Sequence, residues 1–220
     1  MVLMPHPHWP LFDLEVSTPR LTMRYIDDQS ATQLATLAAA GIHDPEFMPF
    51  GMPWTRHESP ELERQALQFY WRCRVETSPQ SWVINFAVFV DGEIVGSSGL
   101  MAEDYPTMRQ FETGSWLGRE YQGRGIGTEM RIATLAVGFL GLDAEWATTG
   151  AWHDNGPSLG VTTKLGYTPR GHRRMVRDSD HSDVMHTFEM SRAHFDEHLS
   201  RDDIELRGID AVRVQLAISD

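Results

Sequence analysis

The sequence lacks several features that mark particular classes of protein. Its 220 residues include one cysteine, so no internal disulfide can form, and a reducing cytoplasm is the expected location. No apolar run approaches about 18 residues, which argues against a membrane span. The start of the chain has no basic segment leading an apolar one, as a secretory signal would. We therefore expect no membrane span, no signal peptide and no disulfide.

Positive charge is also scarce. Lys and Arg number 19 against 31 Asp and Glu, which gives a formal net charge of −12. This balance argues against a nucleic-acid partner, because binding to phosphates requires a basic surface. An acidic surface favours cationic partners such as amines, although an acidic charge that only maintains solubility is the simpler explanation.

The remaining composition is typical of a globular chain, with 41% hydrophobic and 23% charged residues. No break in composition divides the chain, so residues 1–200 are expected to form one α/β domain. Residues 201–220 are expected to pack on that domain as an extension. The apolar alternation over residues 204–216 is consistent with an extra strand, a dimer contact or a covering arm, so a homo-oligomer is one of the open outcomes.

Local patterns predict the order of the secondary structure. Two β-rich runs flank Asp91-Gly92, which is typical of a two-residue hairpin turn. The apolar residues Leu62, Ala66, Phe69 and Cys73 recur at helical spacing, so Cys73 is interpreted as a small buried side chain. The predicted strands cover residues 18–25, 82–90, 93–100, 109–117, 145–151, 170–177 and 184–190, with a polar turn at 178–183, and the predicted helices cover residues 28–40, 60–73, 128–140, 156–165 and 192–199.

A glycine- and arginine-rich turn joins the predicted strand at 109–117 to the helix at 128–140. Gly123, Gly125 and Gly127 free the backbone there for conformations that other residues avoid. Exposed N–H groups at the positive end of a helix bind anions, and Arg124 adds a fixed positive charge. The turn therefore predicts a phosphate site.

Three phosphate-binding patterns compete for this turn. A P-loop needs a lysine after its last glycine, whereas Thr128 follows Gly127. A dinucleotide fingerprint needs glycines at a different spacing, and the acidic residue that follows, Glu145, is badly placed for a ribose. The stretch Gln122-Gly123-Arg124-Gly125-Ile126-Gly127 instead resembles the Gln/Arg-x-x-Gly-x-Gly/Ala motif of the GNAT N-acyltransferases.

Two further stretches resemble the same family. Asn155-x-x-Ser158-x-x-Val161-x-x-Lys164-Leu165-Gly166-Tyr167 is similar to the family's second motif, about 30 residues after the first. The opening Thr18-Pro19-Arg20-Leu21 is similar to the first strand of the ribosomal-protein (RimJ/RimL-like) branch. The resemblance covers about residues 18–192.

This resemblance implies a GNAT fold, with a mixed, mostly antiparallel sheet that is splayed at the cofactor site and has helices on both faces. It implies transfer of an acetyl group, or a larger group such as succinyl, from acyl-coenzyme A to a primary amine by direct attack. The acceptor is then a protein N-terminus, a polyamine or a small-molecule amine. A non-catalytic acyl-coenzyme A sensor or interaction module is the alternative.

The family's cofactor contacts carry over to the matching positions. The resemblance implies that the glycine turn binds the pyrophosphate, that a main-chain N–H near Leu117 polarises the thioester carbonyl, and that Asn155 bonds the pantetheine arm. The expected cofactor-binding residues are Trp116, Leu117, Gln122, Gly123, Arg124, Gly125, Ile126, Gly127, Thr128, Asn155 and Ser158.

The catalytic residues follow from the chemistry that the family performs. Glu112 is the candidate general base, and strand alternation places Glu112, Gly114 and Trp116 on one face. Burial would raise the pKa of Glu112 towards the range that suits a base. The alternative is a carboxylate that faces solvent or pairs with Arg109. Thr162 and Ser158 are the candidate proton donors to the leaving thiolate.

An apolar, proline-stiffened loop at residues 42–56 lies between the first two predicted helices. It either covers the core or lines the acceptor pocket. The expected acceptor contacts are His43, Asp44, Phe50 and Trp54, although a His-Asp-Pro turn explains His43 and Asp44 equally well. We expect no metal, because His194 and His198 are four residues apart on a helix but lack a third ligand of matching spacing.

Overall fold

The computed structural model describes residues 5–178 and 181–219. The strands are β1 (Glu15–Ser17), β2 (Thr22–Tyr25), β3 (Trp82–Val90), β4 (Glu93–Ala102), β5 (Gln110–Leu117), β6 (Trp146–Trp152), β7 (Thr168–Asp178), β8 (His181–Ser191) and β9 (Glu205–Arg207). The helices are α1 (Asp28–Ala39), α2 (Glu61–Val75), α3 (Tyr105–Met108), α4 (Ile126–Ala136), α5 (Gly156–Lys164), α6 (Arg192–His198) and α7 (Ile209–Gln215).

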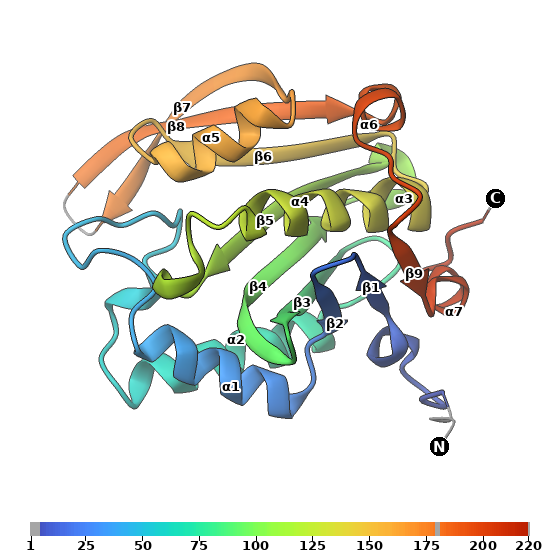
Figure 1. Ribbon diagram of the computed structural model, residues 1–220, viewed down its shortest axis with the longest axis horizontal. Helices are drawn as coiled ribbons and strands as arrows, with labels where there is room; N and C mark the ends of the chain where they lie inside the picture. The colour runs from blue at the N-terminus through green and yellow to red at the C-terminus, as the bar shows by residue number, and fades with distance from the viewer. Residues whose placement is uncertain (1–4, 179–180, 220) are drawn as a thin grey trace.

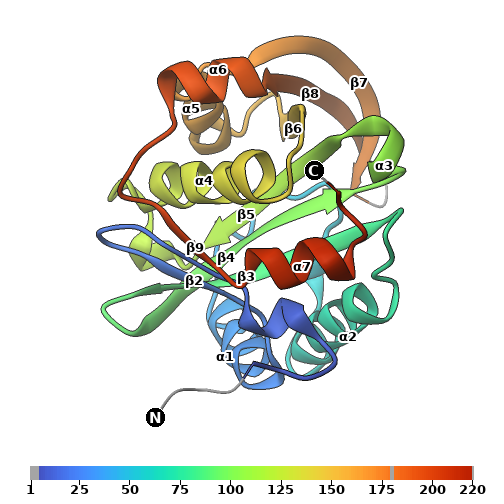
Figure 2. The ribbon, with the colours of Figure 1, turned by 90° about the vertical axis from the view of Figure 1, so that its right-hand side faces the viewer.

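All nine strands form one sheet in the order β7-β8-β6-β5-β4-β3-β2-β1-β9. Every neighbouring pair is antiparallel except β5 and β6, which run parallel (Figure 1). The helices α1 and α2 cover one face, while α4 crosses the other face with α5, α6 and α7 around it (Figure 2). The predicted mixed, mostly antiparallel sheet with helices on both faces is confirmed.

The N-terminal strand differs from the prediction. Residues 18–25 were expected to form one strand, but the chain makes a short hairpin of β1 and β2, closed where the Thr18 N–H donates to the Leu21 carbonyl. The alternation predicted over residues 18–25 therefore holds only from Thr22 onwards. The hairpin of β3 and β4 around Asp91-Gly92 is confirmed, with Asp91 and Gly92 both at positive φ.

The helices α1 and α2 form the layer over one face. The Asp27 carboxylate accepts from the Ser30 N–H, and the Ser30 hydroxyl accepts from the Asp27 N–H, so a capping box fixes the start of α1. On α2, Cys73 is buried, and burial raises its thiol pKa to about 11, which supports a structural side chain. The predicted apolar stripe is wrong at Phe69, which is 47% exposed, because Tyr70 is the residue that faces the core.

The opposite face carries the larger core, which gathers around α4. This helix begins at Ile126, two residues before the predicted start, and ends in a π-helical turn at Val137–Gly141. Gly138 in that turn touches the Phe111 ring so closely that a Cβ would lie 2.2 Å from it. The absence of a side chain at Gly138 therefore lets the helix end pack against β5.

The sheet opens between β5 and β6. Their pairing runs through Gln110–Trp146, Phe111–Ala147 and Glu112–Thr148 and then stops. Beyond that point β5 stays paired with β4 as far as Leu117, and β6 stays paired with β8 as far as Trp152. The two strands therefore diverge into a V whose apex lies at Glu112 and Thr148. This is the splay that the family resemblance implied.

The C-terminal part begins with the long hairpin of β7 and β8 and the short helix α6, which the Ser191 side chain caps. The predicted polar turn at 178–183 includes residues 179 and 180, which lie outside the described residues. Of the outcomes left open for residues 204–216, an extra strand is found for β9 alone, which pairs with β1, whereas α7 follows with Val212 and Leu216 buried in the core. Among the described residues, no helix has the length and apolar character needed to cross a membrane.

Candidate active site

The glycine turn presents a helix N-terminus without a side-chain cap. Gly123 and Gly125 have φ values of 73° and 80°, in the left-handed region that favours glycine. Gly125 occupies the N-cap position of α4, where no side chain accepts from the first-turn amides, in contrast to α1, α5 and α6. The free N–H groups of Ile126, Gly127 and Thr128 therefore suit a phosphate.

Two arginines lie beside these amides. Arg124 is exposed in the turn itself, and the Arg20 guanidinium donates to the Arg124 carbonyl over 3.2 Å. Arg20 was not among the predicted site residues, because it comes from the β1–β2 turn about 100 positions earlier. The Gln122 side chain has a structural role in the turn, and its predicted cofactor contact stays a prediction. Its amide donates to the carbonyls of Ile42 and Leu117, 2.9 Å each, and so fixes the turn against the 42–56 loop.

The Leu117 N–H points into the V. The Gly118 N–H donates to the Val95 carbonyl on the β4 side, and β5 and β4 stay in one-to-one register as far as Leu117. Because successive amides of a strand point to opposite sides, the Leu117 N–H faces β6. The pairing with β6 has ended there, so this amide is available to a carbonyl oxygen between the strands.

The two strands of the V carry the same pattern on one face. On β5, Glu112, Gly114 and Trp116 follow one another at alternate positions. On β6, the in-register residues are Thr148, Gly150 and Trp152. The side chains of these residues lie on the α1–α2 face, where Trp116 packs against residues of α1 and α2. The absence of side chains at the two glycines leaves a floor of backbone beside the Glu112 carboxylate.

The Glu112 side chain is exposed, as one of its two alternative interpretations expected, although the protein around it still reduces the hydration of the carboxylate. This burial raises the pKa of Glu112 above its ordinary value of 4.5, Arg173 on β7 opposes the shift, and Glu103 adds to it. The predicted direction of the shift is confirmed. The other alternative, a pair between Glu112 and Arg109, is not found, because Arg109 forms an ion pair with Asp143.

Aromatic side chains form a wall at the wide end of the V. The rings of Phe50 and Trp54 are 5.3 Å apart, and Trp54 lies 6.0 Å from Trp116. The structure thus brings two predicted acceptor contacts onto the face that carries Glu112. Trp116, predicted as a cofactor contact, belongs to this wall.

His43 and Asp44 lie at the base of the same loop and are engaged in holding its turn. The His43 ring donates from Nδ1 to the Asp44 carbonyl and lies 2.7 Å from the Thr55 hydroxyl through Nε2. The Asp44 carboxylate accepts from the Glu46 N–H. These bonds are those of the alternative, a His-Asp-Pro turn, and substrate contact by His43 or Asp44 stays a prediction.

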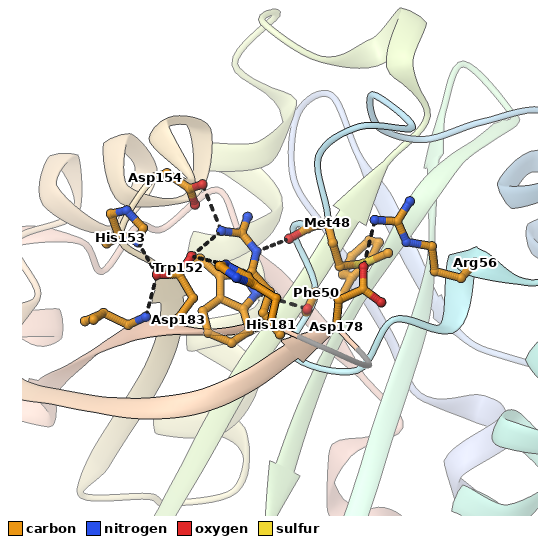
Figure 3. A network of polar contacts seen from close by, with 11 residues as sticks. Met48, Phe50, Arg56, Trp152, His153, Asp154, Asp178, His181 and Asp183 are labelled. Carbon is orange, nitrogen blue, oxygen red and sulfur yellow. Dashed lines mark hydrogen bonds and ion pairs between the residues drawn. The ribbon is translucent and has the colours of Figure 1, made fainter.

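Figure 3 shows a polar network between the 42–56 loop and the end of β6, with Met48, Asp154 and Asp183 labelled. Arg177 joins these three residues. Its guanidinium, only 7% exposed, donates to the Met48 carbonyl and to the carboxylates of Asp154 and Asp183, and it stacks over the Trp152 ring. The Trp152 indole N–H in turn donates to the Phe50 carbonyl. The 42–56 loop is therefore fixed across the end of β6 and over the wide end of the V.

The same network contains three side chains of the types that bind metal ions. The ligand atoms of His153, Asp154 and Asp183 lie within 4.8 Å of one another. Arg177 already pairs with both carboxylates at 2.8 Å, so their negative charge is compensated by a guanidinium. We therefore read this cluster as an ion-pair network, and the absence of a metal stays a prediction.

The second family motif lies at the start of α5. The Asn155 carbonyl oxygen accepts from the Ser158 N–H as a helix cap, and its amide donates to the Pro49 carbonyl. Thr162 is 1% exposed, and its hydroxyl donates to the Ser158 carbonyl, so it has no proton free for a thiolate. The Ser158 hydroxyl is partly exposed and has no hydrogen-bond partner among the described residues.

Sequence reasoning missed three contributors: Arg20, Trp152 and Arg177. A signal for Trp152 existed, because Thr113-Gly114-Ser115-Trp116 and Thr149-Gly150-Ala151-Trp152 share the pattern Thr-Gly-x-Trp. No local pattern distinguishes Arg177 from the other arginines of β7.

Comparison with known proteins gives a family match and a set of similar folds. Residues 20–168 match the profile described as an acetyltransferase (GNAT) domain. A Vibrio cholerae protein proposed to be a ribosomal-protein-serine acetyltransferase superposes with a TM-score of 0.60 at 20% identity, covering 80% of this chain and 97% of its own. A microcin self-immunity acetyltransferase, solved with acetyl-CoA and AMP, gives 0.63 at 17% identity, covering 79% and 93%.

A spermidine/spermine N-acetyltransferase of Vibrio cholerae gives a TM-score of 0.63 at 15% identity, with 82% of this chain and 99% of that chain covered. At sequence identities this low, the structural similarity shows a shared fold and no more.

Proposed function

Because the chain belongs to the GNAT acetyltransferase family, we propose that it transfers an acyl group from acyl-coenzyme A to a primary amine at the V between β5 and β6. One observation carries the assignment of this site: Glu112, with its raised pKa, stands where the two strands part. An uncapped helix N-terminus and two arginines at the other end of the V fit the pyrophosphate of the donor.

The reaction needs a deprotonated amine. We assign this step to the Glu112 carboxylate, which takes a proton from the ammonium acceptor through a chain of waters along the V. The amine nitrogen then attacks the thioester carbonyl carbon, the C–S bond breaks, and the nitrogen loses its second proton to water as the amide forms. The thiolate of coenzyme A leaves with the electron pair of that bond and must be protonated.

Two groups complete the transfer. The Leu117 N–H donates to the carbonyl oxygen as its negative charge develops, in the manner of an oxyanion hole. Its role is main-chain, so changing the Leu117 side chain should affect the chemistry little. We assign protonation of the thiolate to the Ser158 hydroxyl, because the Thr162 hydroxyl is committed inside α5.

The acceptor is proposed as an amine of one of three kinds: a polyamine, a protein N-terminus or a small molecule. Two similar folds are named for action on spermidine and on a ribosomal protein, which supports the first two kinds. Membership of the RimJ/RimL-like branch rests on the Thr18-Pro19-Arg20-Leu21 stretch. A cytoplasmic location and a homo-oligomer remain proposals.

The experiment compares thiol release by the wild-type protein and by Glu112→Gln, with acetyl-CoA and a panel of spermidine, an N-terminal peptide and a small primary amine. We expect turnover with at least one acceptor, with kcat lowered by about 10²- to 10⁴-fold in the variant. Equal calorimetric affinity of both proteins for acetyl-CoA would show that the donor site is intact. Full turnover by Glu112→Gln would refute the assigned base, and binding without turnover would favour the sensor alternative.

A further inference from the structure

Arg131 lies beneath the V on the face opposite Glu112. It comes from the second turn of α4 and is 5% exposed. One terminal nitrogen donates to the hydroxyls of Thr113 (2.9 Å) and Thr149 (3.1 Å), and the other donates to the Ser115 hydroxyl (3.1 Å). These hydroxyls belong to both strands of the V, so the guanidinium spans the gap between them.

The positive charge of Arg131 has no anionic partner. Within residues 5–178 and 181–219, no carboxylate lies within ion-pair distance of it, and its Nε has no hydrogen-bond partner. By contrast Arg177, which is similarly buried, pairs with two aspartates. A buried guanidinium that contacts only neutral hydroxyls carries a large desolvation cost, which an anionic ligand would offset.

A donor bound in the V would have its acyl group directed towards the Arg131 guanidinium. The phosphate turn follows directly on the C-terminal end of β5, and the apex of the V lies at Glu112. A donor whose pyrophosphate occupies the turn and whose carbonyl meets the Leu117 N–H therefore extends its acyl group towards the apex. Ser115, which Arg131 contacts, is two residues nearer the apex, about 7 Å along a strand.

We propose that Arg131 binds the terminal carboxylate of a dicarboxylic acyl group, so that the preferred donor is succinyl-coenzyme A or a homologue of similar length. An acetyl group is too short to approach the guanidinium, whereas a four-carbon acyl group places its carboxylate several ångströms beyond the thioester. A guanidinium suits this role because its planar donors match a carboxylate. This inference rests on the proposed function and names its donor.

The bonds that form and break are those of the transfer already described, since the distal carboxylate does not react. The amine gains a succinyl group in place of a proton, and coenzyme A leaves as the thiol. The product therefore carries a carboxylate where the acceptor carried an ammonium.

The test compares succinyl-, butyryl- and acetyl-coenzyme A as donors to one acceptor. Butyryl is the matched control, because it has four carbons and no carboxylate. We expect wild-type kcat/KM for succinyl-coenzyme A to exceed that for butyryl-coenzyme A by about 100-fold or more, as for a buried charged contact. In Arg131→Met this ratio should fall at least tenfold, while Arg64→Met, on the exposed surface of α2, should keep it.

A wild-type ratio near one would overturn the inference even if Arg131→Met does not fold. An equal loss of all three donors in a folded Arg131→Met would also overturn it, because the guanidinium would then only tie the strands together. Transfer from acetyl-coenzyme A without preference for succinyl would refute this inference alone. No transfer from any donor would refute the proposed function as well.

Discussion

The two strands of the V carry nearly the same sequence and have different roles. β5 reads Glu112-Thr113-Gly114-Ser115-Trp116, and β6 reads Thr148-Thr149-Gly150-Ala151-Trp152. β6 is paired with β8 along its whole length, and its tryptophan is fully buried and anchored by the Phe50 carbonyl and by Arg177. β5 is likewise paired with β4 from Glu112 to Leu117, but its tryptophan, Trp116, is partly exposed.

The comparison shows that the Thr-Gly-x-Trp pattern occurs both in a strand that is held rigidly and in a strand that carries the proposed base. The shared threonines bind Arg131 on one face, and the shared glycines leave a backbone floor on the other. β5 alone has a carboxylate at the apex, whereas both strands have main-chain amides that face the open gap. We infer that β6 is the fixed wall of the site and β5 is the reactive strand.

The largest expected effect on kcat comes from substituting one of the two residues at the apex of the V. Glu112→Gln should lower kcat by about 10²- to 10⁴-fold, because the base is lost while the shape is kept. Thr148→Val, its in-register partner on β6, should change kcat by less than about threefold. Steady-state kinetics of both variants test the comparison, and similar losses in the two would show that the apex is only structural.

The next effect concerns the anchor of β6. Arg177→Met should destabilise the fold by about 1–3 kcal/mol, since Asp154 and Asp183 lose the guanidinium between them and the Met48 carbonyl loses a donor. The KM for the acceptor should rise more than the affinity for acetyl-CoA falls, because the 42–56 loop is released. Thermal unfolding and calorimetry measure the two effects.

Arg170→Met on the same strand is the control for Arg177→Met. Arg170 pairs with Glu189 at the surface, so its loss should change stability by less than about 1 kcal/mol. Equal destabilisation by both variants would contradict the anchoring role.

A smaller effect is expected at the floor of the V. Gly114→Ala should fold normally, because a Cβ there would meet only the Met101 methyl at 3.6 Å. The new methyl group narrows the space beside Glu112, so the KM for the acceptor should rise several-fold with donor affinity unchanged. Gly160→Ala on α5 is the control, because a Cβ there would meet nothing within 4 Å. Gly92→Ala is unsuitable, because Gly92 has a positive φ that strains any other residue. An unaltered KM in Gly114→Ala would place the acceptor elsewhere.

The smallest effect is a change of stability with pH. The folded protein holds the proton of Glu112 more tightly than the unfolded chain, because burial raises the pKa of this carboxyl. Its stabilising contribution is therefore present below about pH 4 and is lost as the pH rises through the folded-state pKa. Glu112→Gln should thus unfold at a slightly higher temperature than wild type at pH 7, with no gain at pH 4. If Glu112→Gln unfolded at a higher temperature than wild type only at pH 4, the folded-state pKa of Glu112 would be lowered, and the raised pKa would be contradicted.

Much of the fold follows from local chemistry that the sequence displays. The predicted hairpin at Asp91-Gly92 is correct because it depends on neighbours in the chain, and the helix caps at Asp27, Asn155 and Ser191 depend on neighbours too. The glycines of the phosphate turn and the alternation from Glu112 to Trp116 are local in the same way. The family resemblance added the order of the elements and the place of the splay.

The missed features depend on contacts between distant parts of the chain. Arg20 and Arg177 belong to the site only because turns and strands far from the motifs fold beside them. The apolar helix at residues 128–140 gave no reason to separate Arg131 from solvated arginines, since its burial depends on hydroxyls from β5 and β6. Thr162 was placed by its distance from Asn155, whereas its hydroxyl is directed by the helix that contains it.

The most direct test of the central claim is amide hydrogen exchange with and without acetyl-CoA. We predict protection of the segment from Ser115 to Leu117 and of the phosphate turn, and no change at the alternate amides of β6 that are already paired with β8. Protection confined to other segments, or none at all with the donor bound, would contradict the placement of acyl transfer between β5 and β6.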